Sequence, residues 1–184
     1  MKKIFTLLLF TSCLEIYAQS FVAPAPKLDL KAYILIEPQT GTVIAEYNSD
    51  LNVEPASMTK IMTSYVVADQ IGNDLINLND SVLISEKAWR MGGSKMFIEA
   101  SRRVSVEDLL KGVIIQSGND ASVALAEYAG GTEEGFVDLM NAYAQSLGMN
   151  NTTFLNSTGL PAEGHYSSAK DLAYLTSNFI NKFP

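Results

Sequence analysis

The stretch that most constrains this chain is a predicted helix over residues 57–70, whose side chains are apolar nearly all the way round. Its apolar residues fall on every face of the helix: Met58, Ile61, Met62, Tyr65, Val66 and Val67. A helix without a wide polar face is one that other elements surround. The sequence therefore predicts a fold packed around a central, buried helix, with the first turn of that helix at the edge of the core.

A serine and a lysine stand at the start of this helix. Ser57 begins it and Lys60 follows three residues later, so their Cβ atoms should lie roughly 5–6 Å apart on one face. A serine beside a neutral lysine is a nucleophile with its base, and the helix start favours an anion nearby. A helix-capping serine with a solvated lysine is the alternative. That alternative is expected at the second Ser-x-x-Lys, Ser167 and Lys170, where a capping box opens an ordinary amphipathic helix.

Composition removes several classes of function. The chain has 184 residues, 47% apolar and 18% charged, which is typical of one globular domain with a core. A net charge of −7, without a basic run, argues against a nucleic-acid partner. With one histidine, His165, and one cysteine, Cys13, neither thiol catalysis in the mature chain nor a histidine- or cysteine-rich metal site is expected. We therefore expect no metal and no cofactor.

The first residues are predicted to be a targeting segment. Residues 1–18 have a positive start, an apolar run and a small residue, Ala18, before a plausible cleavage site, which is the layout of a secretory signal peptide. The run is too short to span a bilayer. Lipid attachment at Cys13 is the alternative. Residues 19–30 contain alternating prolines and are expected to form an extended arm, and the mature protein is expected outside the cytoplasm.

The order of elements is two strands and then almost only helices. Residues 32–36 and 42–47 flank a Pro/Gly turn and predict a hairpin, with the apolar first strand buried on both faces. A short strand is expected within residues 79–85, and further helices over about 105–115, 120–129, 133–147 and 169–182. Because a lone hairpin is marginally stable, we expect later strands to complete the sheet and residues 1–184 to be a fragment.

A second group of polar residues, Ser117-Gly118-Asn119, interrupts two apolar helices. These are ordinary turn residues, yet a short loop between buried helices can direct a hydroxyl and an amide into a cleft. Ser117 would there relay a proton between Lys60 and a leaving amine. Asn119 would hydrogen-bond a substrate peptide group and hold Lys60 in place.

The two groups in order, Pro55-Ala56-Ser57-Met58-Thr59-Lys60 and Ser117-Gly118-Asn119-Asp120, resemble those of the low-molecular-mass penicillin-binding proteins, the serine-type D-alanyl-D-alanine carboxypeptidases. The resemblance extends to residues 33–36, 62–66, 139–141 and 166–169. It implies an α/β (α+β) fold of the β-lactamase and penicillin-binding transpeptidase type. Residues 31–184 would be the N-terminal hairpin and helical subdomain of that fold, without its later strands.

The resemblance also implies a mechanism. Ser57 would attack the carbonyl between two D-alanines, Lys60 would accept its proton, Ser117 would pass the proton to the departing D-alanine, and Asn119 would bind the substrate amide. The implied partners are peptidoglycan stem peptides ending in D-Ala-D-Ala and the β-lactams that mimic them. The implied location is the periplasm or cell envelope, with membrane association only through a C-terminal anchor that these residues do not contain.

The departure from the family pattern is the missing Lys-Thr-Gly strand, which in the family supplies an oxyanion-hole N–H and a cation beside the substrate carboxylate. We therefore expect residues 1–184 alone to be inactive or nearly so.

Three alternative functions stay open. The first is a class A β-lactamase, which needs a Glu-x-x-Leu-Asn loop that is absent here. The second is a Ser-His-Asp hydrolase, which would have to use His165 and a Gly-x-Ser-x-Gly elbow. The third is a truncated relative that binds muropeptides without turnover.

Overall fold

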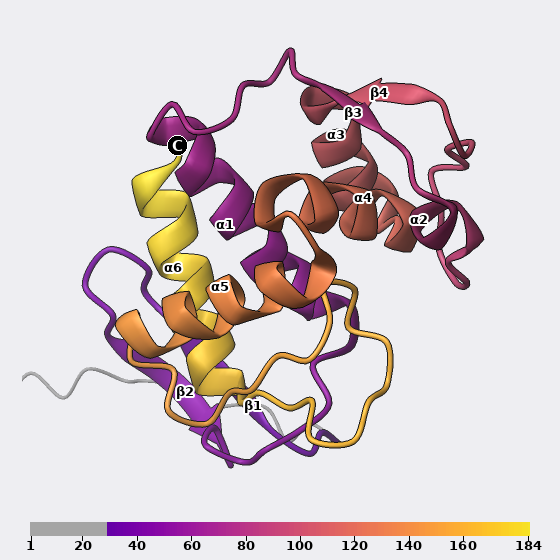
Figure 1. The fold of residues 1–184 in the computed structure, drawn as a ribbon. Coiled ribbons are helices and arrows are strands. Elements are labelled where there is room, and N and C mark those ends of the chain that lie inside the picture. Colours follow the sequence, from indigo (N-terminus) through magenta and orange to yellow (C-terminus); the bar gives the residue numbers. More distant parts are fainter. Residues whose placement is uncertain (1–28) are drawn as a thin grey trace, which may run out of the picture.

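The computed structural model describes residues 29–184. The predicted signal peptide, the alternative lipid site at Cys13 and nearly all of the predicted arm lie outside these residues. The chain begins with a hairpin of β1 (Tyr33–Ile36) and β2 (Val43–Tyr47) and continues into helices packed around α1 (Thr59–Gly72). In Figure 1, α1 runs through the middle of the helical part. The predicted order of a hairpin followed mainly by helices is confirmed.

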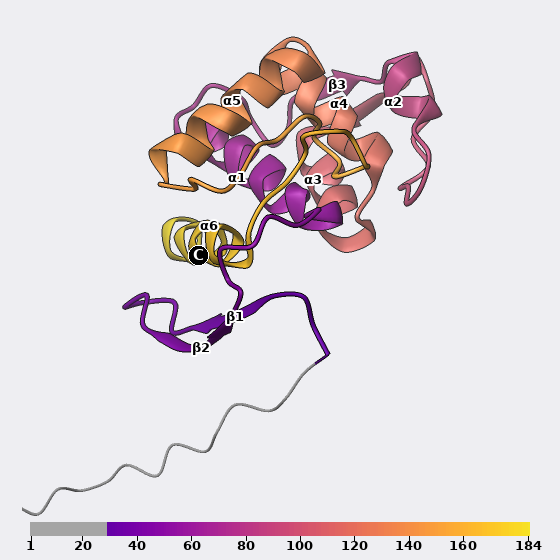
Figure 2. The ribbon, with the colours of Figure 1, turned by 90° about the horizontal axis from the view of Figure 1, so that it is seen from below.

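The hairpin pairs in antiparallel register but is only half buried. Tyr33 lies opposite Tyr47 and Leu35 opposite Ala45. The side chain of Leu35 is 55% exposed, so the prediction that the first strand is buried on both faces is wrong for the described residues. The reason is visible in Figure 2: α6 (Ala169–Lys182) separates the hairpin from the other helices and covers only one of its faces.

The predicted central helix is confirmed. A single 3₁₀ turn, Ala56–Met58, leads into α1, in which ten of fourteen residues are buried. The helix packs against α3, α4, α5 and α6, so little of its surface faces solvent. Ser57 lies on the 3₁₀ turn and Lys60 on the first turn of α1, which places both residues at the predicted edge of the core.

Apart from α6, the remaining elements lie on the side of α1 away from the hairpin (Figure 2). Ser105, Thr132 and Ser168 cap α3, α5 and α6 by accepting a backbone N–H three residues on, as helix-start signals predict. The short elements α2 and β4 were not predicted, because neither is long enough to show a period. Bounds not given above are β3 (Ser81–Leu83), α2 (Glu86–Arg90), β4 (Arg103–Ser105), α3 (Val106–Gln116), α4 (Asn119–Gly130) and α5 (Glu133–Ser146). Within residues 29–184, no helix combines the length and the apolar character that crossing a bilayer requires.

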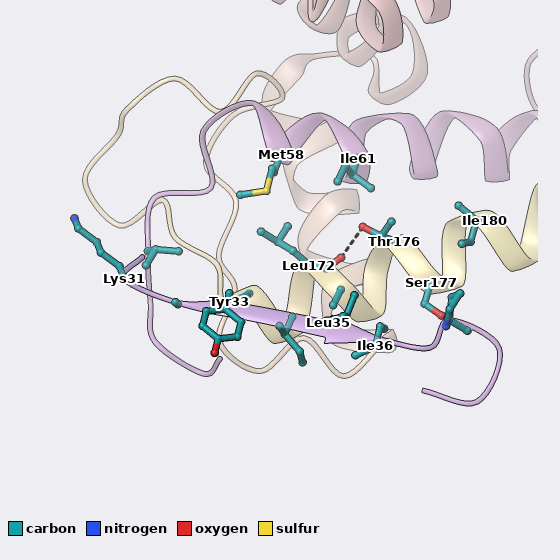
Figure 3. Close-up of a pocket in the computed structure, with 16 residues that line it drawn as sticks. Lys31, Tyr33, Leu35, Ile36, Met58, Ile61, Leu172, Thr176, Ser177 and Ile180 are labelled. Carbon is teal, nitrogen blue, oxygen red and sulfur yellow. Dashed lines mark hydrogen bonds between the residues drawn. The ribbon is translucent and has the colours of Figure 1, made fainter. Parts of the chain in front are cut away.

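An apolar hollow of about 630 Å³ lies between β1 and α6 (Figure 3). Tyr33 and Leu35 line it from the strand, and Leu172 and Ile180 from the helix. Space of this size means that the hairpin rests on α6 without the close packing found around α1.

Candidate active site

Ser57 is held on a tight turn at the positive end of α1. Ala56, just before it, has a left-handed backbone with φ 46°, which is uncommon for a residue with a side chain. The Ala56 carbonyl faces Gly159 so closely that a Cβ there would lie 1.8 Å from its oxygen. The serine itself is exposed and lines a hollow of about 310 Å³. The turn is thus held in place by its approach to Gly159, while the Ser57 hydroxyl remains accessible.

Lys60 is buried, with 4% of its surface exposed, and its amine has three oxygen atoms around it. Nζ donates to Asn119 Oδ1 at 2.8 Å and to the Thr158 carbonyl at 2.7 Å, and lies 3.5 Å from Ser57 Oγ. A neutral amine has two N–H groups and one lone pair. With the two short bonds occupied by the N–H groups, the lone pair is left facing the serine hydroxyl, which is the geometry a general base needs.

Burial lowers the pKa of Lys60 from 10.5 to about 8. No carboxylate within the described part of the chain forms an ion pair with it: its close partners are neutral oxygens. No negative charge beside the amine therefore stabilises its protonated form. About a tenth of the molecules carry a neutral Lys60 at pH 7 and about half do at pH 8.

The loop between α3 and α4 brings Ser117 and Asn119 to the same place. Ser117 ends α3 in a left-handed conformation, φ 53°, and lines the hollow beside Ser57 and Lys60. Asn119 begins α4 and is buried, with Nδ2 donating to the Gly92 carbonyl at 2.7 Å and Oδ1 accepting from Lys60. The structure thus brings together all four residues singled out in the sequence. Their chemical roles stay predictions.

Two contributions to this site were not predicted. The first is the Thr158 carbonyl, which has no side-chain signature; the only signal was the turn sequence Asn156-Ser-Thr-Gly. The second is Asp120, whose carboxylate accepts the backbone N–H groups of Met96, Phe97 and Ile98. Those bonds fasten the segment that also supplies the acceptor for Asn119, so Asp120 supports the site from behind.

The second Ser-x-x-Lys is unlike the first, as predicted. Ser167 is buried and shares a hydrogen bond with the Thr152 hydroxyl, while Lys170 pairs with Asp50 at 3.3 Å. The two residues have separate partners. Spacing alone therefore does not make a nucleophile and base; the buried cluster around Lys60 does.

The single histidine does not face the serine. His165 is buried, accepts the Leu155 N–H at Nδ1 and bonds the Thr59 hydroxyl through Nε2. A Ser-His-Asp arrangement on Ser57 has no support in this geometry. Residues 29–184 hold no cluster of three or more histidine, cysteine, aspartate or glutamate side chains that would suit a metal ion.

The chain matches one protein family over most of its length. The model of Peptidase S11, D-alanyl-D-alanine carboxypeptidase, matches residues 19–184. The D-alanyl-D-alanine carboxypeptidase DacC of Escherichia coli K12 is 47% identical over 174 residues, which is 91% of this chain and 44% of that protein. DacF of Bacillus subtilis is 47% identical over 152 residues, 83% of this chain and 39% of DacF.

Solved structures agree with the sequence matches. The D-alanyl-D-alanine carboxypeptidase DacD of Francisella tularensis superposes with a TM-score of 0.86 at 46% identity, covering 89% of this chain and 40% of DacD. Penicillin-binding protein D2 of Listeria monocytogenes, in its ampicillin-bound form, gives a TM-score of 0.78 at 29% identity, covering 88% of this chain and 66% of that one. The chain spans less than half the length of DacC and DacF.

Proposed function

The chain belongs to the peptidase S11 family of D-alanyl-D-alanine carboxypeptidases, and we propose that it carries the acylation centre of such an enzyme, with Ser57 as the nucleophile. One observation supports this assignment most directly. The buried amine of Lys60 is held by two neutral carbonyl oxygens and has its third direction open toward Ser57 Oγ. The substrate class is a peptide ending in D-Ala-D-Ala.

In the acylation step, Ser57 Oγ attacks the carbonyl carbon of the penultimate D-alanine while the Lys60 amine takes the hydroxyl proton. The C–N bond then breaks, and Ser117, which lines the same hollow, relays that proton to the departing D-alanine amine. An ester on Ser57 and a free D-alanine result. Asn119 holds Lys60 in its productive orientation.

In the second step, water attacks the ester carbonyl. Lys60 serves again as the base, now toward the water, and the proton returns to Ser57 Oγ as the C–O bond breaks. The shortened peptide leaves as a carboxylate. A β-lactam would follow the first step and then persist as a slowly hydrolysed ester on Ser57. The ampicillin-bound form of the Listeria relative supports this part of the proposal.

The activity is proposed for the whole protein that carries these residues. Residues 1–184 contain no Lys-Thr-Gly sequence, and the loss of one oxyanion-hole donor costs roughly 10²–10³ in rate. We therefore expect the described part to acylate slowly when alone. The signal-peptide pattern and the substrate class together support a place in the cell envelope, where peptidoglycan is accessible.

Covalent labelling by a fluorescent penicillin tests the proposal. The full protein should retain the label after denaturation, and peptide mapping should find the added mass on the peptide that contains Ser57. Ser57→Ala should abolish labelling, while Ser81→Ala, on an exposed strand position, should not. A label that persists in Ser57→Ala, or a full protein that binds muropeptide without ever being labelled, would overturn the proposal.

A further inference from the structure

The loop of residues 153–166, between α5 and α6, reaches back to the first turn of α1. In Figure 1 it is the golden segment that passes the N-terminal end of that helix. Its base is closed by a pair of backbone bonds between Thr153 and Tyr166. Its tip supplies the Thr158 carbonyl that Lys60 contacts at 2.7 Å. Whatever fastens this loop to α1 therefore also sets the surroundings of the proposed base.

Two hydroxyls of α1 make that fastening, on either side of Lys60. Thr63 Oγ1 donates to the Ser157 carbonyl at 2.7 Å. Thr59 Oγ1 lies 2.9 Å from His165 Nε2. Both threonines are fully buried and the histidine is 5% exposed. The contacts at positions 59, 60 and 63 thus form one continuous attachment between the loop and a single side of the helix.

The tautomer of His165 follows from its two partners. Nδ1 accepts the backbone N–H of Leu155 at 3.1 Å, so it carries no proton. The neutral ring then has its N–H at Nε2, which donates to the Thr59 hydroxyl. The ring edge also packs against Phe154, with 5.9 Å between centroids. One neutral imidazole therefore joins two points of the loop to the residue just before Lys60.

We propose that His165 is a positioning residue for Lys60: as a neutral imidazole it fastens the 153–166 loop to Thr59 and so holds the Thr158 carbonyl on the lysine amine. The inference rests on the proposed role of Lys60 as the base. It gives this buried side chain, which the acylation steps do not use, a part in keeping the lysine dehydrated and aimed at Ser57.

The physical consequence concerns both the pKa and the direction of the amine. Releasing the loop admits water to Nζ, and water supplies acceptors at high dielectric, which stabilises the ammonium form more than one neutral carbonyl does. The pKa of Lys60 should then rise toward 10.5. Each unit of that rise lowers the neutral fraction at pH 7 about tenfold. Without the Thr158 carbonyl the amine would also keep only one short hydrogen bond, to Asn119, and would be less firmly aimed at Ser57.

Three substitutions separate positioning from simple packing. His165→Phe keeps a ring against Phe154 but removes both hydrogen bonds. His165→Gln offers an amide oxygen to the Leu155 N–H and an amide N–H to Thr59, so it should restore the attachment. Thr59→Val removes the partner hydroxyl at nearly constant volume. If the two residues act as one unit, the double variant should be no worse than the more affected single variant.

The pKa of Lys60 is measured by competitive labelling of amines with fluorodinitrobenzene across pH 6–11, with mass spectrometry of the Lys60 peptide. We expect the pKa to rise by at least one unit in His165→Phe and in Thr59→Val, and to stay at the wild-type value in His165→Gln. Thermal unfolding shows which variants are folded. A folded His165→Phe with an unchanged Lys60 pKa, or a His165→Gln as impaired as His165→Phe, would overturn the inference.

A second readout is the pH profile of acylation by fluorescent penicillin, whose rising limb should move to higher pH in His165→Phe. The amine titration needs no penicillin. If the wild type is never acylated, the proposed function fails while the titration still decides the role of His165. If the wild type is acylated and the limb does not move in a folded His165→Phe, the role of His165 fails while the proposed function stands.

Discussion

At the scale of the residue, the burial of the Lys60 amine without a counter-charge costs stability but makes the amine reactive. Its amine is buried among neutral oxygens, and no carboxylate of the described residues pairs with it. Desolvation therefore lowers its pKa to about 8, which a surface lysine would not show. The same burial means that the folded protein holds a proton on this amine less well than the unfolded chain does.

This difference predicts a specific dependence of stability on pH. Between pH 8 and 10.5 the unfolded chain still binds a proton at Lys60 that the folded protein has lost, so the contribution of Lys60 to stability increases as pH rises. Full titration amounts to at most about 3 kcal/mol. Urea unfolding at pH 7 to 10.5 should show this difference: as pH rises, the free energy of unfolding of the wild type should increase relative to that of Lys60→Met by up to this amount. Parallel curves would contradict the burial of the amine.

Asn119 does not stabilise the protonated form of Lys60 as a carboxylate would, because its oxygen carries no charge. Asn119→Asp would place a carboxylate 2.8 Å from Nζ and raise the pKa of Lys60 by about 1–3 units. Penicillin acylation at pH 7 should then fall about 10- to 1000-fold and recover partly at pH 9–10. Asn178→Asp is the control, since Asn178 also donates its amide to a backbone carbonyl, that of Tyr174, but lies on α6 outside the site. Equal acylation losses in the two variants would point to misfolding instead of charge.

At the scale of the element, the site depends on the close approach of two backbone turns. The 3₁₀ turn that carries Ser57 contacts the turn at residues 156–159 through the Ala56 carbonyl and Gly159. The latter turn is shaped by Asn156, whose oxygen accepts three bonds from Thr158 and Gly159. Neither turn is stable as an isolated segment, so each provides the surface that fixes the other.

Gly159→Ala should therefore disturb both turns. Gly159 has φ +82°, and its new methyl would meet the Ala56 oxygen at 1.8 Å. We expect the free energy of unfolding to fall by roughly 2–4 kcal/mol, and penicillin acylation to fall with it. Gly164→Ala is the control: its φ is +90°, but its nearest neighbour is 3.6 Å away, so only the backbone strain of about 1–2 kcal/mol applies. Similar losses in both variants would mean that the close approach at Gly159 carries no cost.

At the scale of the whole molecule, the described part consists of a tightly packed helical layer and a loosely attached hairpin. Buried residues concentrate on α1, α3, α4 and α5, whereas β1 and β2 expose Leu35, Ile44 and Tyr47. The hollow of about 630 Å³ lies at the junction with α6 (Figure 3). Local stability should follow this difference in packing.

Hydrogen exchange measured by mass spectrometry on residues 1–184 should show it. Amides of β1 and β2 should exchange at least about tenfold faster than those of α1 and α4, because opening the hairpin exposes little buried apolar surface. The hairpin contacts α6 where Asn181 and Ser177 both donate to the Pro38 carbonyl, and this contact would be lost when the hairpin opens. Equal protection of the hairpin and of α1 would contradict the loose attachment.

Much of this arrangement could be predicted from the sequence, because local signals are strong where they repeat. The apolar positions of residues 57–70 predicted a buried helix, and capping serines marked the starts of α3 and α6. The prediction for the first strand was wrong because an apolar run indicates only the residue types, not the burial of the strand. How many neighbours cover the strand depends on what packs against it.

By itself the sequence determined that a serine and a lysine would lie close together at the start of a buried helix, since a three-residue spacing on helical turns fixes that separation. The sequence also indicated Asn119 as one partner of the lysine amine, but only the tertiary structure decided the other. Its partners, Asn119 and the Thr158 carbonyl, are 59 and 98 residues away along the chain. A carbonyl oxygen is the same atom in every residue, so no pattern of residue types marks the one that the fold brings to a buried amine.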